Sequence, residues 1–263
     1  MTTPRRLVFG EVADLYDRHR PSYPPALVDD IIAGSGVAAG GRAVEVGAGT
    51  GKATAMVAAR GVAVLAIEPS AAMAALARRN CAAYPGVEIV ESDFERWDTG
   101  GERFALLYSA QAWHWIDPAV GYDRARQALT PGGLLAVFWN RPAWGRSPLR
   151  DALTAAYLAA APDMPTDGPL HPANLAPQDE DRDWAAEIAA VPGFAGAETR
   201  RYEWEAVYSA GEYRGLLATL SEIALLDDGR RRMLVDGVAA AIDAHGGRLV
   251  MPMATRLCLG RAV

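Results

Sequence analysis

The 263-residue sequence predicts a single α/β domain, built on a seven-stranded and mostly parallel sheet with helices on both faces. Short, β-rich apolar runs alternate with helical stretches from about residue 42 to 140, and two further strands are expected near the C-terminal end. A glycine-rich turn joins the first of these runs to its helix. Hydrophobic residues make up 51% of the chain and charged residues 22%, a globular composition that excludes a mainly disordered chain.

The five early strands are expected at apolar runs that each end in polar or aromatic residues. Pro69 prevents the second strand from continuing, and Ser70 is placed to cap the helix that follows it. A turn at residues 131–133, Pro-Gly-Gly, introduces the fifth strand. The expected strands are residues 42–46, 62–67, 87–90, 104–109 and 134–139, and the expected helices between them are residues 52–60, 71–79 and 118–129.

The pattern changes after Asn140. Residues 141–183 contain many prolines and one clear helical stretch, residues 149–160, which is typical of a cap or lid. Further helices are expected at residues 183–190, 212–226 and 230–244, and the two late strands at residues 199–208 and 248–259. The expected divisions of the domain are an N-terminal arm (1–35), a cofactor-binding core (36–140), a cap (141–190) and C-terminal strands and helices (191–263).

Charge and targeting signals restrict the partners. The net charge is −6, with a pI near 5.3, so we expect neither a nucleic-acid partner nor an anionic membrane surface. The arginines at residues 230–232 are interpreted as one solvated turn of helix. No signal peptide and no apolar run of about 20 residues is present, which favours a cytoplasmic protein. Cys81 and Cys258 lack the paired spacing of a metal site, so no metal is expected. Monomer and homodimer both stay open.

The glycine loop after the first strand is the first functional motif. Gly47, Gly49 and Gly51 allow the backbone to turn sharply and to approach a ligand closely. A dinucleotide-binding fingerprint would continue as G-x-G-x-x-G, whereas Lys52 stands at the next position and the acidic Glu45 precedes the loop. This difference favours another nucleoside cofactor.

Acidic residues follow the next two strands. Ligands of an open parallel sheet bind beyond the carboxyl ends of its strands. Glu68, followed by Pro69, is placed to accept hydrogen bonds from ribose hydroxyls. Asp93 can accept a hydrogen bond from the exocyclic amine of adenine, while the backbone of Phe94 can contact the edge of the adenine ring. Three strand ends would thus bind one adenosine.

Together these motifs resemble those of class I S-adenosylmethionine-dependent methyltransferases, which have a Rossmann-like fold. Residues 44–51, Val-Glu-Val-Gly-Ala-Gly-Thr-Gly, resemble the first motif of that family. Glu68 resembles its ribose-binding acid, Asp93 and Phe94 its adenine contact, and residues 129–133 its turn before the fifth strand. The resemblance extends over residues 42–140 and implies S-adenosylmethionine as the cofactor.

Two further segments resemble a small-molecule branch of that family, which includes the trans-aconitate methyltransferases. They are residues 111–117, Gln-Ala-Trp-His-Trp-Ile-Asp, and residues 16–24 of the arm. That branch methylates carboxylates, so the resemblance implies a small-molecule acceptor, either a carboxylate or a natural-product scaffold.

The expected site residues follow from these motifs. His114 is the candidate catalytic base for a hydroxyl, amine or carbon acceptor, whereas a carboxylate acceptor is already ionised and needs no base. The acceptor is expected at Tyr23, Trp113, His114 and Trp115. The cofactor is expected at Tyr16, Arg20, Glu45, Gly47, Ala48, Gly49, Gly51, Glu68, Pro69, Asp93, Phe94 and Ala110.

Two alternatives stay open at this point. One is an NAD(P)-dependent oxidoreductase, which would require a third glycine at the spacing that Lys52 interrupts. The other is a non-catalytic S-adenosylmethionine-binding protein that keeps the fold and the pocket.

Overall fold

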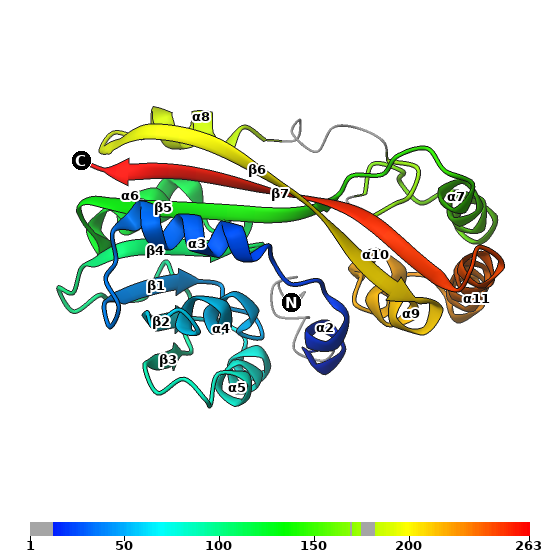
Figure 1. Ribbon diagram of the computed structural model, residues 1–263, viewed down its shortest axis with the longest axis horizontal. Helices are drawn as coiled ribbons and strands as arrows, with labels where there is room; N and C mark the ends of the chain where they lie inside the picture. Colours follow the sequence, from blue (N-terminus) through cyan, green and yellow to red (C-terminus); the bar gives the residue numbers. More distant parts are fainter. Residues whose placement is uncertain (1–12, 169, 175–181) are drawn as a thin grey trace.

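The computed structural model describes residues 13–168, 170–174 and 182–263, and it contains one seven-stranded sheet in the order β3-β2-β1-β4-β5-β7-β6 (Figure 1). Strands β1 to β5 pair in parallel, whereas β7 runs antiparallel to both β5 and β6. The predicted fold class is therefore confirmed. The strands are β1 (Arg42–Val46), β2 (Ala63–Ile67), β3 (Val87–Val90), β4 (Phe104–Ala110), β5 (Leu129–Pro142), β6 (Phe194–Ser209) and β7 (Arg248–Ala262).

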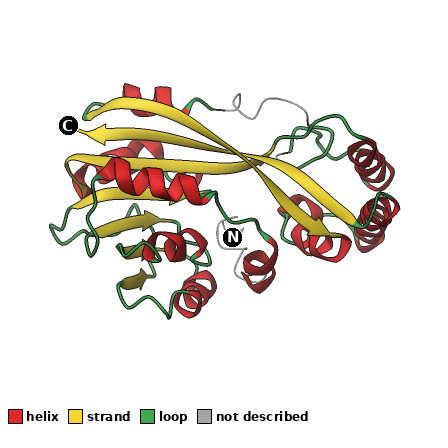
Figure 2. Cartoon of the chain, viewed as in Figure 1, coloured by secondary structure: helices red, strands yellow, loops and turns green. Residues whose placement is uncertain are grey.

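Helices cover both faces of the sheet (Figure 2). Leu27 and Ile31 of α3 and Val57 of α4 pack on one face, while Tyr122 of α6 and Ile188 of α8 pack on the other. The helices are α2 (Ala13–His19), α3 (Pro25–Ser35), α4 (Lys52–Ala58), α5 (Ala71–Asn80), the short 3₁₀ helix η2 (Trp113–Trp115), α6 (Pro118–Ala128), α7 (Pro148–Ala160), α8 (Trp184–Ala190), α9 (Ala210–Ala218), α10 (Ser221–Ala224) and α11 (Asp228–Ala244). None of the helices in the described part of the chain is long and apolar enough to cross a membrane.

Local signals set most of the helix starts. Ser70 caps α5, since its side chain accepts a hydrogen bond from the backbone N–H of Met73. Asp117 caps α6 in the same way, and Pro118 at the first helical position needs no hydrogen-bond partner for its nitrogen. These starts agree with the sequence pattern.

Two local expectations were wrong. The turn at residues 131–133 does not precede the fifth strand but forms an irregularity inside β5, where the register with β4 shifts between Phe104 and Leu106. The helix expected at residues 212–226 is two helices, α9 and α10. Leu220 between them is extended, with φ −92° and ψ 125°, which ends one helix and starts the next.

The distal ends of β6 and β7 extend away from the rest of the sheet and carry a helical lobe, defined here as α7, α9, α10, α11 and these strand ends (Figure 1). Its core includes Leu153 and Tyr157 of α7, Leu216 of α9 and Leu234 of α11, all at most 2% exposed. The cap expected at residues 141–190 covers only part of this lobe. Helix α8 lies outside it, against β6 and β7, and most of the lobe comes from the C-terminal residues.

Candidate functional site

A cavity of about 330 Å³ lies at the carboxyl ends of the parallel strands, between the N-terminal arm and the helical lobe. Its volume is in the range of small-molecule sites. The structure brings most of the sequence-predicted residues together in its wall. They are Tyr16, Arg20, Tyr23, Glu45, Gly47, Ala48, Gly49, Glu68, Pro69, Asp93, Phe94, Ala110, His114 and Trp115.

The glycine loop is held by its neighbouring strands. The N–H groups of Gly47 and Ala48 donate to the carbonyl of Ile67 at the end of β2, at 2.9 and 3.1 Å. Gly47 has φ 73°, and a Cβ there would lie 2.3 Å from the Cβ of Ala112, so only glycine fits. Gly49 also has a positive φ, 57°, but a Cβ there would meet no atom within 4 Å. Gly49 therefore borders open space that a ligand can enter.

Gly51 does not line the cavity. It is the N-cap of α4 with φ 84°, and a Cβ there would lie 3.0 Å from the Cys81 Sγ and 3.2 Å from the Ala77 Cα. This glycine allows α4 and α5 to approach each other, and we do not place it among the ligand contacts.

Glu68 links the glycine loop to the end of β2. Its Oε2 accepts a hydrogen bond from the backbone N–H of Gly49 at 2.8 Å, and its Oε1 accepts from the N–H of Ser70 at 2.9 Å. The residue is only 6% exposed, and burial raises the pKa of its carboxyl. Each carboxylate oxygen has a second lone pair, so Glu68 can orient the loop and accept from a ligand hydroxyl at once.

Glu45 is the most buried acid of the cavity wall. Its Oε2 accepts hydrogen bonds from the hydroxyls of Thr54 at 2.5 Å and Tyr108 at 3.0 Å. Its Oε1 is buried without a hydrogen-bond partner among the described residues. Burial raises the pKa of this carboxyl to about 8. An unsatisfied oxygen at this position fits a ligand that brings an N–H group or a positive charge.

Asp93 and Phe94 follow β3. The Phe94 ring is 2% exposed and packs on Trp97 and Trp113, at centroid distances of 6.2 and 6.0 Å. Most of this ring is enclosed by the core, and Phe94 also lines the cavity. The Asp93 carboxylate is partly exposed and lies 4.0 Å from the Arg96 guanidinium.

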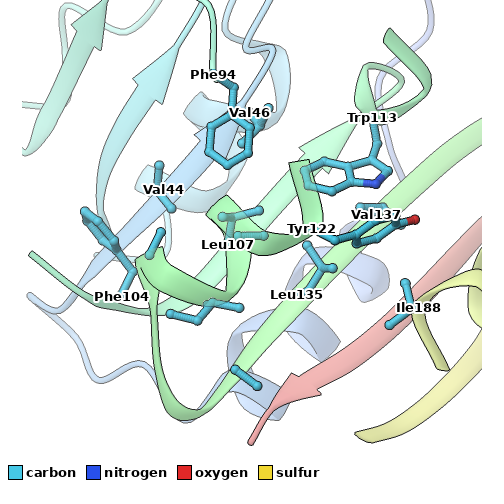
Figure 3. Close-up of a cluster of buried hydrophobic side chains, with 14 of the residues drawn as sticks. Val44, Val46, Phe94, Phe104, Leu107, Trp113, Tyr122, Leu135, Val137 and Ile188 are labelled. Atoms are coloured by element: carbon cyan, nitrogen blue, oxygen red, sulfur yellow. The ribbon is translucent and has the colours of Figure 1, made fainter. Parts of the chain in front are cut away.

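Trp113 differs from its expected position. Its ring packs against Phe94 and lies 5.4 Å from that of Tyr122, within the core under α6 (Figure 3). The short helix η2 sends His114 and Trp115 to the cavity and Trp113 to the core, because consecutive side chains point in different directions along a 3₁₀ turn. Trp113 is thus not a contact of the cavity.

His114 stands at the mouth of the cavity and is tied to β5. The Trp139 indole Nε1 donates a hydrogen bond to the His114 Nδ1 at 3.1 Å. Partial burial of the ring, and then the positive charges of Arg141 and Arg182, lower the pKa of His114 to about 4. His114 is therefore uncharged at neutral pH.

The N-terminal arm ties the cavity to the lobe. The Arg20 guanidinium donates to the Thr219 side chain at 2.9 Å and to its carbonyl at 3.1 Å, and it lies 5.1 Å from the ring centroid of Tyr16. Tyr23 packs edge-on against Phe138 of β5, at 5.0 Å. The arm is thus in contact with both the sheet and α9.

Sequence reasoning missed Gln111, Asn140 and Arg141, which line the cavity at the ends of β4 and β5. Gln111 has φ 61°, unusual for a residue other than glycine and frequent at functional sites. Asn140 donates to the Ser22 carbonyl at 2.8 Å and so holds the arm. The rule that selected Glu68 and Asp93, polar residues following a strand, could also have selected Asn140 and Arg141.

A second group of cavity residues was missed because no sequence motif marks them. These residues belong to the helical lobe or to the segment that follows α7, and they are Leu170, Leu220, Ser221, Glu222 and Met253.

Known proteins that are similar in sequence to this chain are described as methyltransferases. A family model described as a methyltransferase domain matches residues 43–133. An uncharacterized methyltransferase of Mycobacterium tuberculosis is 35% identical over 171 residues, which are 59% of this chain and 68% of that relative. A relative of the same description in Mycobacterium bovis matches equally well.

Solved structures share the fold. A methyltransferase of Anaeromyxobacter dehalogenans described as type II is 22% identical, with a TM-score of 0.61 over 92% of this chain and 97% of that one. A SAM-dependent methyltransferase of Thiobacillus denitrificans, solved with S-adenosyl-L-homocysteine, is 16% identical, with a TM-score of 0.54 over 100% of both chains. The structures share the fold, and the 35% identity to the mycobacterial proteins over 68% of their length shows that the chain belongs to the methyltransferase family.

Proposed function

We propose that this protein transfers the methyl group of S-adenosylmethionine to a carboxylate oxygen of a small molecule, bound between η2, which carries His114, and the helical lobe. The observation that carries the proposal is that two arginine residues, Arg20 and Arg141, line the same cavity as the glycine loop. Two carboxylates then find partners there: the methionyl carboxylate of the cofactor at Arg20, and that of the acceptor at Arg141. Guanidinium groups pair well with carboxylates because they offer several donors in one plane.

The cofactor contacts in this proposal start from the glycine loop. Glu68 accepts from the ribose hydroxyls, while Asp93 and the Phe94 backbone contact the adenine. The carboxyl of Glu45, whose Oε1 is unsatisfied, accepts from the methionyl ammonium group, whose positive charge favours the ionised form of this acid. The other residues that we propose to contact the cofactor also line the cavity: Gly47, Ala48, Gly49, Pro69, Ala110 and Tyr16.

Methylation of a carboxylate requires no acid or base from the protein. When bound, S-adenosylmethionine supplies a methyl group that its sulfonium has already activated. An acceptor carboxylate oxygen forms the new C–O bond as the C–S bond breaks, and the bonding electrons go to sulfur. No proton is transferred, since a carboxylate is ionised at neutral pH. The side chains therefore need only to hold oxygen and methyl in line within a site shielded from water.

A product assay tests the proposal. The protein is incubated with methyl-labelled S-adenosylmethionine and a panel of mono-, di- and tricarboxylic acids, beside matched hydroxyl and amine compounds. We expect a labelled product from a carboxylic acid that releases its label in mild alkali, as a methyl ester does. An alkali-stable product would show methylation of a hydroxyl or an amine instead. Absence of product across the panel would favour a binding role.

Arg141 provides the matched variant. Arg141→Gln should raise KM for the carboxylic acid while leaving the affinity for S-adenosylhomocysteine nearly unchanged. Arg146→Gln is the control, because Arg146 is exposed on the same connection and does not line the cavity. Equal kinetics of the two variants would remove Arg141 from the acceptor site.

A further inference from the structure

The hydrogen bond between Trp139 and His114 determines which nitrogen of the imidazole carries its proton. An indole Nε1–H can only donate, so the His114 Nδ1 that it contacts at 3.1 Å must be the unprotonated nitrogen. A neutral imidazole then has its proton on Nε2. The ring nitrogen that Trp139 leaves available is therefore a hydrogen-bond donor.

Trp139 is itself firmly held. It is 4% exposed, and its ring stacks on that of Trp184 at the start of α8, with a centroid distance of 4.5 Å and an interplanar angle of 18°. The Arg182 guanidinium lies 3.9 Å from the Trp184 ring centroid. Glu187 accepts two hydrogen bonds from that guanidinium, both at 2.6 Å, and one from the Tyr122 hydroxyl at 2.7 Å. The indole donor thus belongs to a network that joins β5, α6 and α8.

A base at this position would need a free basic nitrogen facing the acceptor. The only basic nitrogen of this tautomer, Nδ1, is already occupied by the Trp139 indole. The positive charges near the ring, Arg141 and Arg182, also oppose the imidazolium that a base would become. Both observations argue against the catalytic-base role that the sequence suggested for His114.

We propose that Trp139 is a positioning residue that fixes the Nε2–H tautomer of His114, so that His114 donates a hydrogen bond to an oxygen of the acceptor and does not remove a proton from it. This inference rests on the proposed function, because a donor suits a carboxylate that is methylated without a base. Trp184 supports the indole by stacking but does not itself set the tautomer.

The tautomer is measured directly by long-range ¹H–¹⁵N correlation NMR of ¹⁵N-histidine-labelled protein, without any acceptor. The chain has four histidines, and His114→Asn identifies the signals of His114. In the wild type we expect the proton on Nε2. In Trp139→Phe, which keeps the aromatic stacking but lacks the donor, we expect both tautomers. Trp184→Phe, the control, should behave as the wild type.

Two results would overturn the inference: a proton on Nδ1 in the wild-type protein, or an unchanged pattern in Trp139→Phe. The first does not depend on Trp139→Phe, so it stays decisive if that variant fails to fold. Neither result bears on the alkali-labile product that tests the proposed function. An alkali-stable product would conversely overturn the proposed function and leave the tautomer as measured.

Kinetics with the acceptor then test the donor role. His114→Phe should lower kcat/KM by about 10-fold or more, because an acceptor oxygen loses its partner. His114→Gln, whose amide supplies an N–H, should recover part of that loss, whereas a base role would leave it as inactive as His114→Phe.

Discussion

Glu68 and Gly49, nineteen residues apart in the chain, are joined by a hydrogen bond of 2.8 Å from the Gly49 N–H to the Glu68 Oε2. The acid at the end of β2 thus supports the glycine loop at the end of β1 before any ligand arrives. Two parts of the proposed cofactor site therefore depend on each other, and a change in one should affect the other.

Glu68→Ala should weaken the binding of S-adenosylhomocysteine by about 1 to 3 kcal/mol, the cost of leaving polar groups of loop and ribose without partners. Isothermal titration calorimetry measures this difference. Glu91→Ala is the matched control, because Glu91 follows the neighbouring β3 but is exposed and outside the cavity wall. An unchanged affinity of Glu68→Ala would refute the ribose role.

Gly49→Ala should abolish most of the thermal stabilisation that S-adenosylhomocysteine gives, since the new methyl group would enter the open space beside the loop. Gly132→Ala is the control. Gly132 also has a positive φ, 76°, and a Cβ added there would meet no atom within 4 Å. It lies near the start of β5, whereas the cavity is at the other end of that strand. Both variants should lose about 1 to 2 kcal/mol of intrinsic stability from left-handed strain. If both kept the same ligand-induced shift, the cofactor would not pass Gly49.

Glu45→Gln should change the pH dependence of stability. The folded pKa of Glu45, about 8, lies above its unfolded value of 4.5 because of burial. The folded state therefore holds a proton that the unfolded state releases, and Glu45 makes the wild type lose stability as the pH rises from about 4.5 to 8. The Tm of Glu45→Gln, minus that of the wild type, should increase over this window and level off above it. Parallel Tm curves would contradict the raised pKa.

Leu153→Ala should destabilise the protein by about 2 to 5 kcal/mol, because Leu153 is fully buried between α7 and the rest of the lobe. Leu158→Ala on the same helix is the control, since Leu158 is 48% exposed. The lobe contributes Leu220 and Met253 to the cavity, so Leu153→Ala should also raise KM for the acceptor more than it weakens cofactor binding. Denaturant unfolding and steady-state kinetics measure the two effects.

Much of the sheet could be predicted from the sequence because its signals are local. Apolar runs of four to six residues, a proline after β2 and the caps Ser70 and Asp117 each act within a few residues of where they stand. The irregularity at residues 131–133 could not be predicted, because it depends on how β5 pairs with β4. The division of α9 from α10 was also missed, since no glycine or proline marks Leu220.

The helical lobe shows the limit most clearly. The sequence pattern indicates that α7 is a helix with one apolar face. Its packing partner α11 begins about 70 residues later, and no local sequence pattern predicts that the two helices pack together. The orientation of Trp113 was missed for a similar reason. An aromatic residue after a strand can face either the core or the ligand, and the 3₁₀ turn of η2 decides which.

The sequence by itself determined the class of fold, the glycine loop and the acids at the ends of β2 and β3, because each depends on short-range chemistry and on the rule that parallel strands end at one edge. Only the tertiary structure decided the part of the cavity that we propose for the acceptor. Arg141, Leu220 and Met253 meet there from separate elements, and Trp139 of β5 reaches His114 in the turn that follows β4. Such contacts join residues far apart in the chain, and packing alone brings them together.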